Sequence, residues 1–395
     1  MKKILISAVA ASAMMSSLSA IEVYKDGNNS VEVYGTLRNV LGYGHSFNSR
    51  AEKNNGVSTS SREITGSDIL FGIQGNSRVG MNFKYNGFIG GALIALNEKT
   101  FQNSTSGTPG FRQLYGGYDF GSAGKLIIGK IETLTTMNFS SDIFDGDSGM
   151  NGFGGTTTST RRFQVQYSLP IGLSFAVSES ELTKQNTTEL KVPIVRKSIP
   201  RVSLSYDYKS ESLLAKVAAT YTHGETYQNK SKDAFLVTAG VKPSFGAAYI
   251  STLLTYGLNA DLMGEMKTPI PGGFSGRIGT LTMTTSIPDD VPNFIANDVS
   301  RYAGLFEFGY SITENFKTII GAGYQLTTTV FQSKRYNLHS YAAFLQLPYS
   351  VSKNFTLIPQ VGYAGLTYKN ALSNKNVSYT NAGGMYALMQ ARFNF

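Results

Sequence analysis

The chain ends in Tyr386-Ala-Leu-Met-Gln-Ala-Arg-Phe-Asn-Phe395, and this closing stretch decides the fold class. Successive side chains of a β-strand point to opposite sides, so a strand with two different faces alternates with a period of two. The intervening residues are polar except Leu388. Counting back in steps of two from the terminal residue gives one apolar face, made of Phe395, Phe393, Ala391, Met389 and Ala387.

The same alternation recurs along the chain from residue 20 onward, without a linker or a change of composition. It is clear in the segments 31–38, 162–169, 201–209 and 301–311. The polar faces carry charges as well as small polar residues, which favours a polar lumen and a lipid-facing exterior over a soluble sandwich. No segment after residue 20 approaches the roughly eighteen consecutive apolar residues that a membrane-spanning helix requires.

The amino-terminal end has the pattern of a secretory signal peptide. Lys2 and Lys3 precede an apolar run over 4–15, and small residues follow. We predict a signal peptide over 1–19, with cleavage after Ser19 or Ala20, and a single domain over 20–395. Removing two of the 35 basic residues leaves 33 against 26 acidic ones, a net charge near +7. The chain has no cysteine, so no disulfide stabilises this secreted domain.

Short turns alternate with long polar stretches, as in outer-membrane barrels. The resulting prediction is an all-β, 16-stranded antiparallel transmembrane barrel; 18 strands remain an alternative, because 259–300 could contain another hairpin. An unpaired backbone amide costs several kcal/mol in hydrocarbon, so the first strand (31–43) should pair with the last (381–395). The long stretches are 48–66, 98–110, 134–160, 180–200, 224–232, 259–300, 329–337 and 369–380.

Several stretches resemble the general trimeric porins of Gram-negative bacteria. The resemblance is strongest over 20–178 and at the carboxyl terminus, where Phe393 and the terminal Phe395 resemble the closing-strand signal that the barrel-assembly machinery reads. It implies a homotrimer in the outer membrane, surrounded by lipid and lipopolysaccharide, and a pore narrowed by an inward-folded third loop. The matching stretches are 20–27, 31–35, 77–81, 111–117 and 118–130.

The third long stretch, 134–160, is the candidate constriction loop. It contains Asp142, Asp145 and Asp147 beside five glycines, which permit sharp bends. A solvated surface loop or a calcium site of the Asp-x-Asp type would show the same spacing.

The resemblance also implies a basic wall opposite that loop. Alternation supports Arg78 and Arg162 and supports Arg112 less well; Arg161 would replace Arg162 if the strand register slipped by one residue. A rim charge or a trimer-interface salt bridge is the alternative for any one of these residues. The full set of candidates is Arg38, Arg78, Arg112, Lys130 and Arg162.

Acids facing bases across a narrow aqueous gap predict a porin for passive diffusion of small hydrophilic solutes and ions. The inward faces carry more bases than acids, which predicts a weak anion preference. A substrate-selective channel or a surface adhesin on the same barrel is the alternative. We expect neither an enzyme, since none of His45, His223 and His339 lies in a nucleophile motif, nor a nucleic-acid partner, since the bases are dispersed. No cofactor or metal is predicted.

Overall fold

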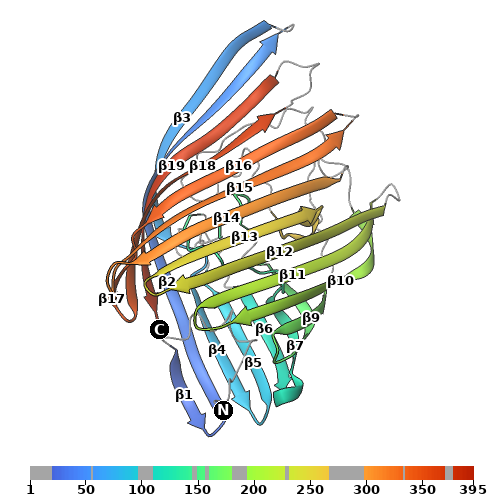
Figure 1. The fold of residues 1–395 in the computed structure, drawn as a ribbon, viewed down its shortest axis with the longest axis vertical. Helices are drawn as coiled ribbons and strands as arrows, with labels where there is room; N and C mark the ends of the chain where they lie inside the picture. Colours follow the sequence, from blue (N-terminus) through green and yellow to red (C-terminus); the bar gives the residue numbers. More distant parts are fainter. Residues whose placement is uncertain are drawn as a thin grey trace.

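The computed structural model of the chain is a closed antiparallel β-barrel (Figure 1). The expected signal peptide, 1–19, lies outside the described residues. Those residues are 20–54, 57–96, 110–144, 149–155, 160–179, 194–226, 231–266, 298–331, 334–369 and 377–395.

The described residues form nineteen strands and two short 3₁₀ turns. In chain order these are β1 (Ile21–Asp26), β2 (Asn29–Asn54), β3 (Val57–Ile73), β4 (Arg78–Tyr85), β5 (Phe88–Ala95), β6 (Gly110–Asp119), η3 (Gly121–Ala123), β7 (Lys125–Glu132), β8 (Arg161–Ser168), β9 (Leu173–Ser178), β10 (Ile194–Lys209), β11 (Leu213–Thr226), β12 (Ser231–Phe245), β13 (Ala248–Leu258), η4 (Ala260–Met263), β14 (Val299–Ser311), β15 (Lys317–Phe331), β16 (Lys334–Gln346), β17 (Tyr349–Ser352), β18 (Phe355–Lys369) and β19 (Val377–Asn394).

In three cases two strands lie end to end and share one position in the barrel, so the nineteen strands fill sixteen positions. β3 and β4 pair with successive parts of β2, and β16 and β17 with successive parts of β18. β1 pairs with β2 beyond the point where β19 ends. The prediction of a sixteen-stranded barrel is confirmed.

The two ends of the chain meet on β2. Phe393 pairs with Leu37 in the register of β19 and β2. Beyond it, Phe395 and Gly35 exchange backbone hydrogen bonds of 2.6 and 3.0 Å. β1 then continues the line of β19, with Ile21 opposite Val33. The expected pairing of first and last strands is therefore present, whereas a strand over 21–26 was not expected.

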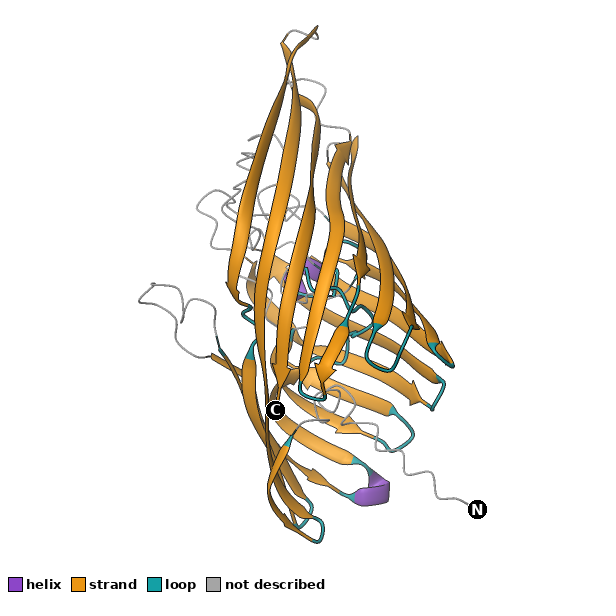
Figure 2. Ribbon diagram, turned by 90° about the vertical axis from the view of Figure 1, so that its left-hand side faces the viewer, coloured by secondary structure: helices purple, strands orange, loops and turns teal. Residues whose placement is uncertain are grey.

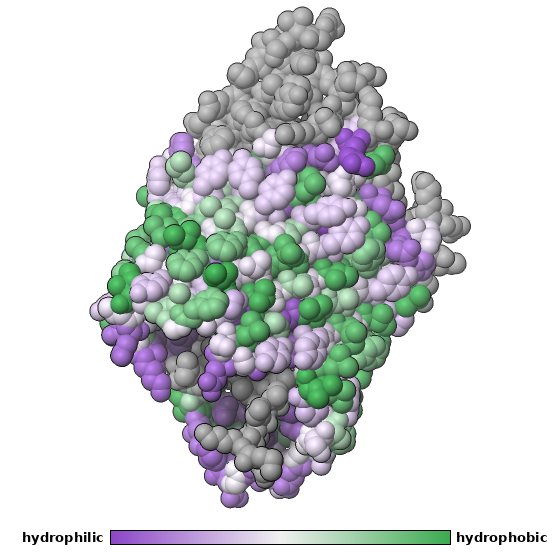
Figure 3. All heavy atoms as spheres, in the orientation of Figure 1, coloured by the Kyte–Doolittle hydropathy of each residue, from purple (hydrophilic) through white to green (hydrophobic). Residues whose placement is uncertain are grey.

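The alternation in the sequence corresponds to two different faces of the barrel wall, one buried and one exposed. In β8, Gln164 and Gln166 are 2% and 7% exposed, whereas Phe163, which lies on the opposite face of the strand, is 56% exposed. The same contrast recurs around the barrel, and Figure 3 shows the result as an apolar band across the outer surface. No helix in the described part of the chain is long and apolar enough to cross a membrane.

The height of the wall differs around the barrel (Figure 1). β4 to β9 have six to ten residues each, whereas β10 to β16 have eleven to sixteen. Two stretches expected to be long loops are hairpins instead: β2 and β3 pair as far as Asn54 and Val57, and β15 and β16 as far as Phe331 and Lys334. In the first hairpin, residues 48–54 and 57–63 are mostly polar, which removes the alternation from the sequence.

Candidate pore constriction

The segment 133–155, part of the connection between β7 and β8, packs over its described residues (133–144 and 149–155) against β11, β13 to β16 and β18. Its apolar side chains pack on residues that lie on the buried faces of their strands; Leu253, for example, is 1% exposed and its neighbour Leu254 is 64% exposed. Figure 2 shows loop segments and η4 between the walls of the barrel. The cluster consists of Met137, Phe139, Met150, Phe153, Ala218, Leu253, Leu305, Ile319, Ala342, Phe344 and Ala364.

Hydrogen bonds hold the middle of this segment against β13, β14 and β16. The backbone N and the Oγ of Ser141 donate to Glu307 Oε2 at 2.7 and 2.9 Å. Gln346 Nε2 donates to the carbonyl of Ser141 at 2.9 Å, and Ser251 Oγ to that of Phe139 at 2.6 Å. Glu307 is completely buried, so its carboxylate serves as an acceptor for the segment.

Asp142 is the only one of the three expected acids within the described residues; Asp145 and Asp147 lie outside them. Asp142 is 3% exposed, and its Oδ1 accepts a 2.6 Å hydrogen bond from Gln360 Nε2 on β18. Gln360 Oε1 in turn accepts from the backbone N of Ile143 at 3.1 Å. Asp142 therefore helps to fasten the segment to the wall.

The end of the segment approaches the wall through glycine. Gly154 has a φ of +118°, which L side chains rarely adopt. A Cβ there would lie 2.3 Å from the carbonyl oxygen of Gly304 and 2.7 Å from Cα of Gly323. Ser340 Oγ also donates to the carbonyl of Gly152 at 2.5 Å. Close backbone contact explains why glycines are concentrated here.

Four arginines gather on one side of the barrel, on β2, β4, β6 and β8. Arg112 interacts electrostatically with Arg38, Arg78 and Arg161, and Arg78 interacts with Arg38 and Arg161. One carboxylate, Glu132, lies among them and accepts from Arg161 Nη2 at 3.1 Å. Four positive charges less one negative charge leave the cluster at +3. The structure thus brings together three of the five expected bases and adds Arg161.

The other two expected bases lie elsewhere. Arg162 donates from Nη2 to the carbonyl of Met263 at 3.4 Å and interacts electrostatically with Arg201 and Glu265. Lys130 is exposed on the same face of β7 as Ile128, and its Nζ donates to the carbonyl of Phe111 at 2.9 Å. Lys130 therefore lies on the outer face.

A buried ion pair is a feature that the sequence did not indicate. Arg201, 2% exposed, pairs with Glu265, which is completely buried just after η4. Thr135 Oγ1 accepts from Arg201 Nη2 at 3.0 Å and donates to Glu265 Oε1 at 2.9 Å, which joins the pair to the segment 133–155. The alternation over 201–209 places Arg201 on the polar face of its strand. Glu265 lies in an expected loop, where no pattern points to its partner.

Comparison with known proteins finds similarity at the level of structure. No family model and no curated protein matches the chain. The outer membrane channel DcaP of Acinetobacter baumannii is 14% identical with a TM-score of 0.59, covering 95% of this chain and 100% of that one. An anion-selective porin from Comamonas acidovorans is 14% identical with a TM-score of 0.56, covering 93% and 100%.

OmpT, an outer membrane protein of Vibrio cholerae, is also 14% identical, with a TM-score of 0.51 and coverage of 95% and 99%. At these identities the likeness establishes the fold. A closed barrel with an apolar outer band satisfies every backbone group within the sheet, as a lipid environment requires. The chain is therefore an outer-membrane β-barrel with the fold of these channels and porins.

Proposed function

We propose that the barrel is a porin, a water-filled channel for passive diffusion of small hydrophilic solutes and ions. The proposal is supported most directly by two features, a cluster of arginines on one side of the barrel and a connecting segment packed against the strands of the other side. The cluster of Arg38, Arg78, Arg112 and Arg161 lies on β2, β4, β6 and β8, and the segment 133–155 packs against β11, β13 to β16 and β18. The segment acts as the constriction loop, as the resemblance to general porins implies.

A net positive wall beside a narrow aqueous passage favours anions. Charged side chains that line a pore set its ion preference, and the walls of low dielectric constant strengthen the field between them. Asp142 offsets little of this charge, because it is buried against Gln360. Similarity to a porin described as anion-selective agrees with a weak anion preference here.

The test is single-channel conductance of the full refolded chain in planar bilayers, with the reversal potential measured in a salt gradient. Arg78→Gln removes one charge from the cluster and should move the reversal potential toward cations, and Arg78→Gln with Arg112→Gln should move it further. Lys130→Gln is the matched control, since it removes one charge from the outer face and should leave the reversal potential unchanged. A cation-preferring native pore would overturn the anion preference.

The same recordings separate the alternative functions. A general porin gives a current that rises linearly with voltage and is not blocked by added solute. Block by one solute would identify a substrate-selective channel. A folded, heat-modifiable barrel without conductance would leave the surface-adhesin alternative.

We further propose that the barrel assembles as a homotrimer. OmpT of Vibrio cholerae is recorded in a trimer form, at 15% identity and a TM-score of 0.50. Conductance steps in groups of three and a detergent-corrected mass of three chains would support the trimer. Single steps and the mass of one chain would exclude it.

A further inference from the structure

The long connection between β13 and β14 begins inside the barrel. Its described start, residues 259–266, contains η4, which Figure 2 draws between the walls; we call these residues the second inward segment. The wall beneath it is the inner face of β12 and β14, because Leu236 is completely buried whereas Val237 is 45% exposed. The apolar residues that pack together here are Ala234, Leu236, Ala260, Met263, Met266 and Ala303.

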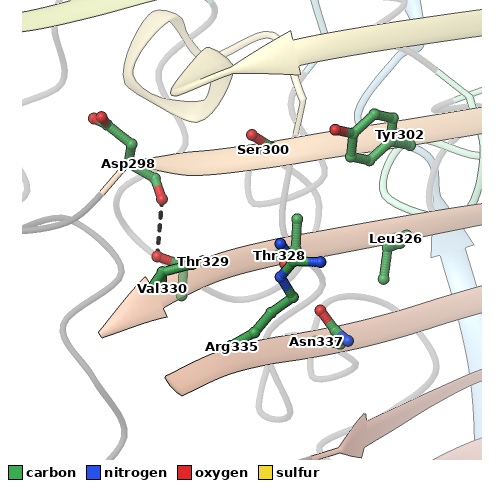
Figure 4. Close-up of a pocket in the computed structure, with 9 residues that line it drawn as sticks. All are labelled: Asp298, Ser300, Tyr302, Leu326, Thr328, Thr329, Val330, Arg335 and Asn337. Atoms are coloured by element: carbon green, nitrogen blue, oxygen red, sulfur yellow. Dashed lines mark hydrogen bonds between the residues drawn. The ribbon is translucent and has the colours of Figure 1, made fainter. Parts of the chain in front are cut away.

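Asn259 turns the chain inward at the rim of the barrel. Its φ is +51°, a left-handed conformation that asparagine adopts more readily than most residues. Its backbone N donates to the carbonyl of Val299 at 2.8 Å, and its Oδ1 accepts from the backbone N of Val299 at 2.9 Å. Asp298 Oδ1 accepts from Asn259 Nδ2 at 3.0 Å, and the carbonyl of Asp298 accepts from Thr329 Oγ1 at 2.8 Å (Figure 4). The two ends of the connection are thus fastened to each other and to β15.

Glu265 joins the second inward segment to the segment 133–155. Besides its ion pair with Arg201, its Oε1 accepts from Thr133 Oγ1 at 3.2 Å and from Thr135 Oγ1 at 2.9 Å. Both threonines are buried, as are Arg201 and Glu265. The two segments therefore meet in direct contact that excludes water.

The backbone of the second inward segment also contacts the start of β8. Thr160 Oγ1 donates to the carbonyl of Gly264 at 3.2 Å, and Arg162 Nη2 donates to that of Met263 at 3.4 Å. The positive charge of Arg162 interacts with the carboxylate of Glu265. The contacts of the segment therefore extend from β8 through β10 and β12 to β14.

We infer that the second inward segment closes the lumen from Arg162 on β8 round to β14 and confines the aqueous passage to the side of the arginine cluster. Arg162 and Arg201 then contribute little to the ion preference, because the segment covers both side chains and Glu265 offsets their charge. Glu265 is a positioning residue, since it holds the two inward segments together. The inference rests on the proposed porin function and specifies which basic residues the permeating ions meet.

Thiol labelling tests the placement of the segment independently of conduction. The chain has no cysteine, so Ala234→Cys introduces a single thiol on the inner face of β12, beneath the segment. In the full refolded chain, this thiol should react slowly with a charged, membrane-impermeant methanethiosulfonate. Ser210→Cys, at an exposed turn, should react fast. Fast labelling of Ala234→Cys would overturn the inference.

Gly257→Val displaces the segment without changing a charge. A Cβ at Gly257 would lie 2.8 Å from Cβ of Ala260 and 2.9 Å from Sδ of Met266. With this change, the thiol of Ala234→Cys should label manyfold faster, while the thiol at the exposed turn keeps its rate. Gly116→Val is the matched control, because a Cβ there meets nothing within 4 Å, and it should leave both rates unchanged.

Conductance then tests the confinement of the passage. Displacement of the segment in Gly257→Val opens a path beside Arg162 and Arg201, so single-channel conductance should rise and the reversal potential should move toward anions. Glu265→Gln should act in the same direction, whereas a merely structural role of Glu265 would leave the ion preference unchanged. Faster labelling of Ala234→Cys with an unchanged reversal potential would overturn the confinement. Slow labelling in a native chain that does not conduct would refute the channel but support the inward placement, so the two failures are distinguishable.

Discussion

Among the single interactions in the barrel, the ion pair of Arg201 and Glu265 should contribute most to the free energy of unfolding. Both side chains are essentially excluded from solvent. Breaking a buried pair by removing one partner costs about 3–5 kcal/mol, because the remaining charge is left uncompensated. Glu265→Gln keeps the volume and some hydrogen bonding, so we expect a loss near the lower end, about 3 kcal/mol, measured by urea unfolding in micelles.

The double variant Arg201→Met with Glu265→Leu is the control for this prediction. Apolar residues of similar volume often replace a buried pair without loss, so the double variant should recover most of the stability. A Glu265→Gln barrel as stable as the native one would show that the pair contributes little. A double variant less stable than the single one would show that Thr135 needs the charged pair to hold the segment 133–155.

The residue scale also shows where sequence reasoning works and where it stops. Period-two alternation placed Arg78 on the inward face, and the structure places it with Arg38. Alternation favours Arg162 over Arg161, whereas in the structure Arg161, the first residue of β8, pairs with Glu132 and interacts electrostatically with Arg78 and Arg112. Asp142 shows the same limit: its partner Gln360 is 218 residues away, and no local pattern reveals such a contact.

At the scale of the element, the segment 133–155 depends on a close backbone approach at Gly154. Gly154→Val would force a side chain into the carbonyl of Gly304 and the backbone of Gly323. Overpacking of this kind costs about 1–3 kcal/mol, so we expect the end of the segment to leave β14 and β15. Single-channel conductance should then increase, with greater current noise.

The matched control for this prediction is Gly116→Val on β6. A Cβ at Gly116 meets nothing within 4 Å, and its φ is not in the left-handed region. Its conductance should equal that of the native chain. Unchanged conductance in Gly154→Val, with the barrel folded, would mean that the segment does not limit the current.

The strands themselves show which elements a sequence can reveal. Where a strand separates lipid from lumen, as in β8, the two faces differ in polarity and the alternation is clear. Beyond the bilayer both faces meet water, and the ends of β2 and β3 are mostly polar on both sides, so this hairpin was expected to be a loop. β1 was missed because it only completes the line of β19, a role that depends on closure of the whole barrel.

At the scale of the whole molecule, closure brings the terminal Phe395 beside Gly35, with β1 continuing the strand beyond it. Phe393 stacks on Phe355 with ring centroids 4.4 Å apart. Both terminal aromatic residues remain more than a third exposed, at 39% for Phe393 and 38% for Phe395. Their contribution to stability is therefore limited, which allows a structural role to be distinguished from an assembly signal.

We predict that Phe395→Ala changes the stability of the refolded barrel by only about 1 kcal/mol, since a fully buried side chain of this size contributes about 1.5–3 kcal/mol. If Phe395 is part of the proposed assembly signal, the same variant should sharply reduce the amount of barrel in the outer membrane in cells. Phe88→Ala, which removes an aromatic ring that is 58% exposed on β5, should affect neither quantity strongly. Equal outer-membrane levels of the two variants would refute the assembly signal. A large loss of stability in vitro would instead show that Phe395 stabilises the closed sheet.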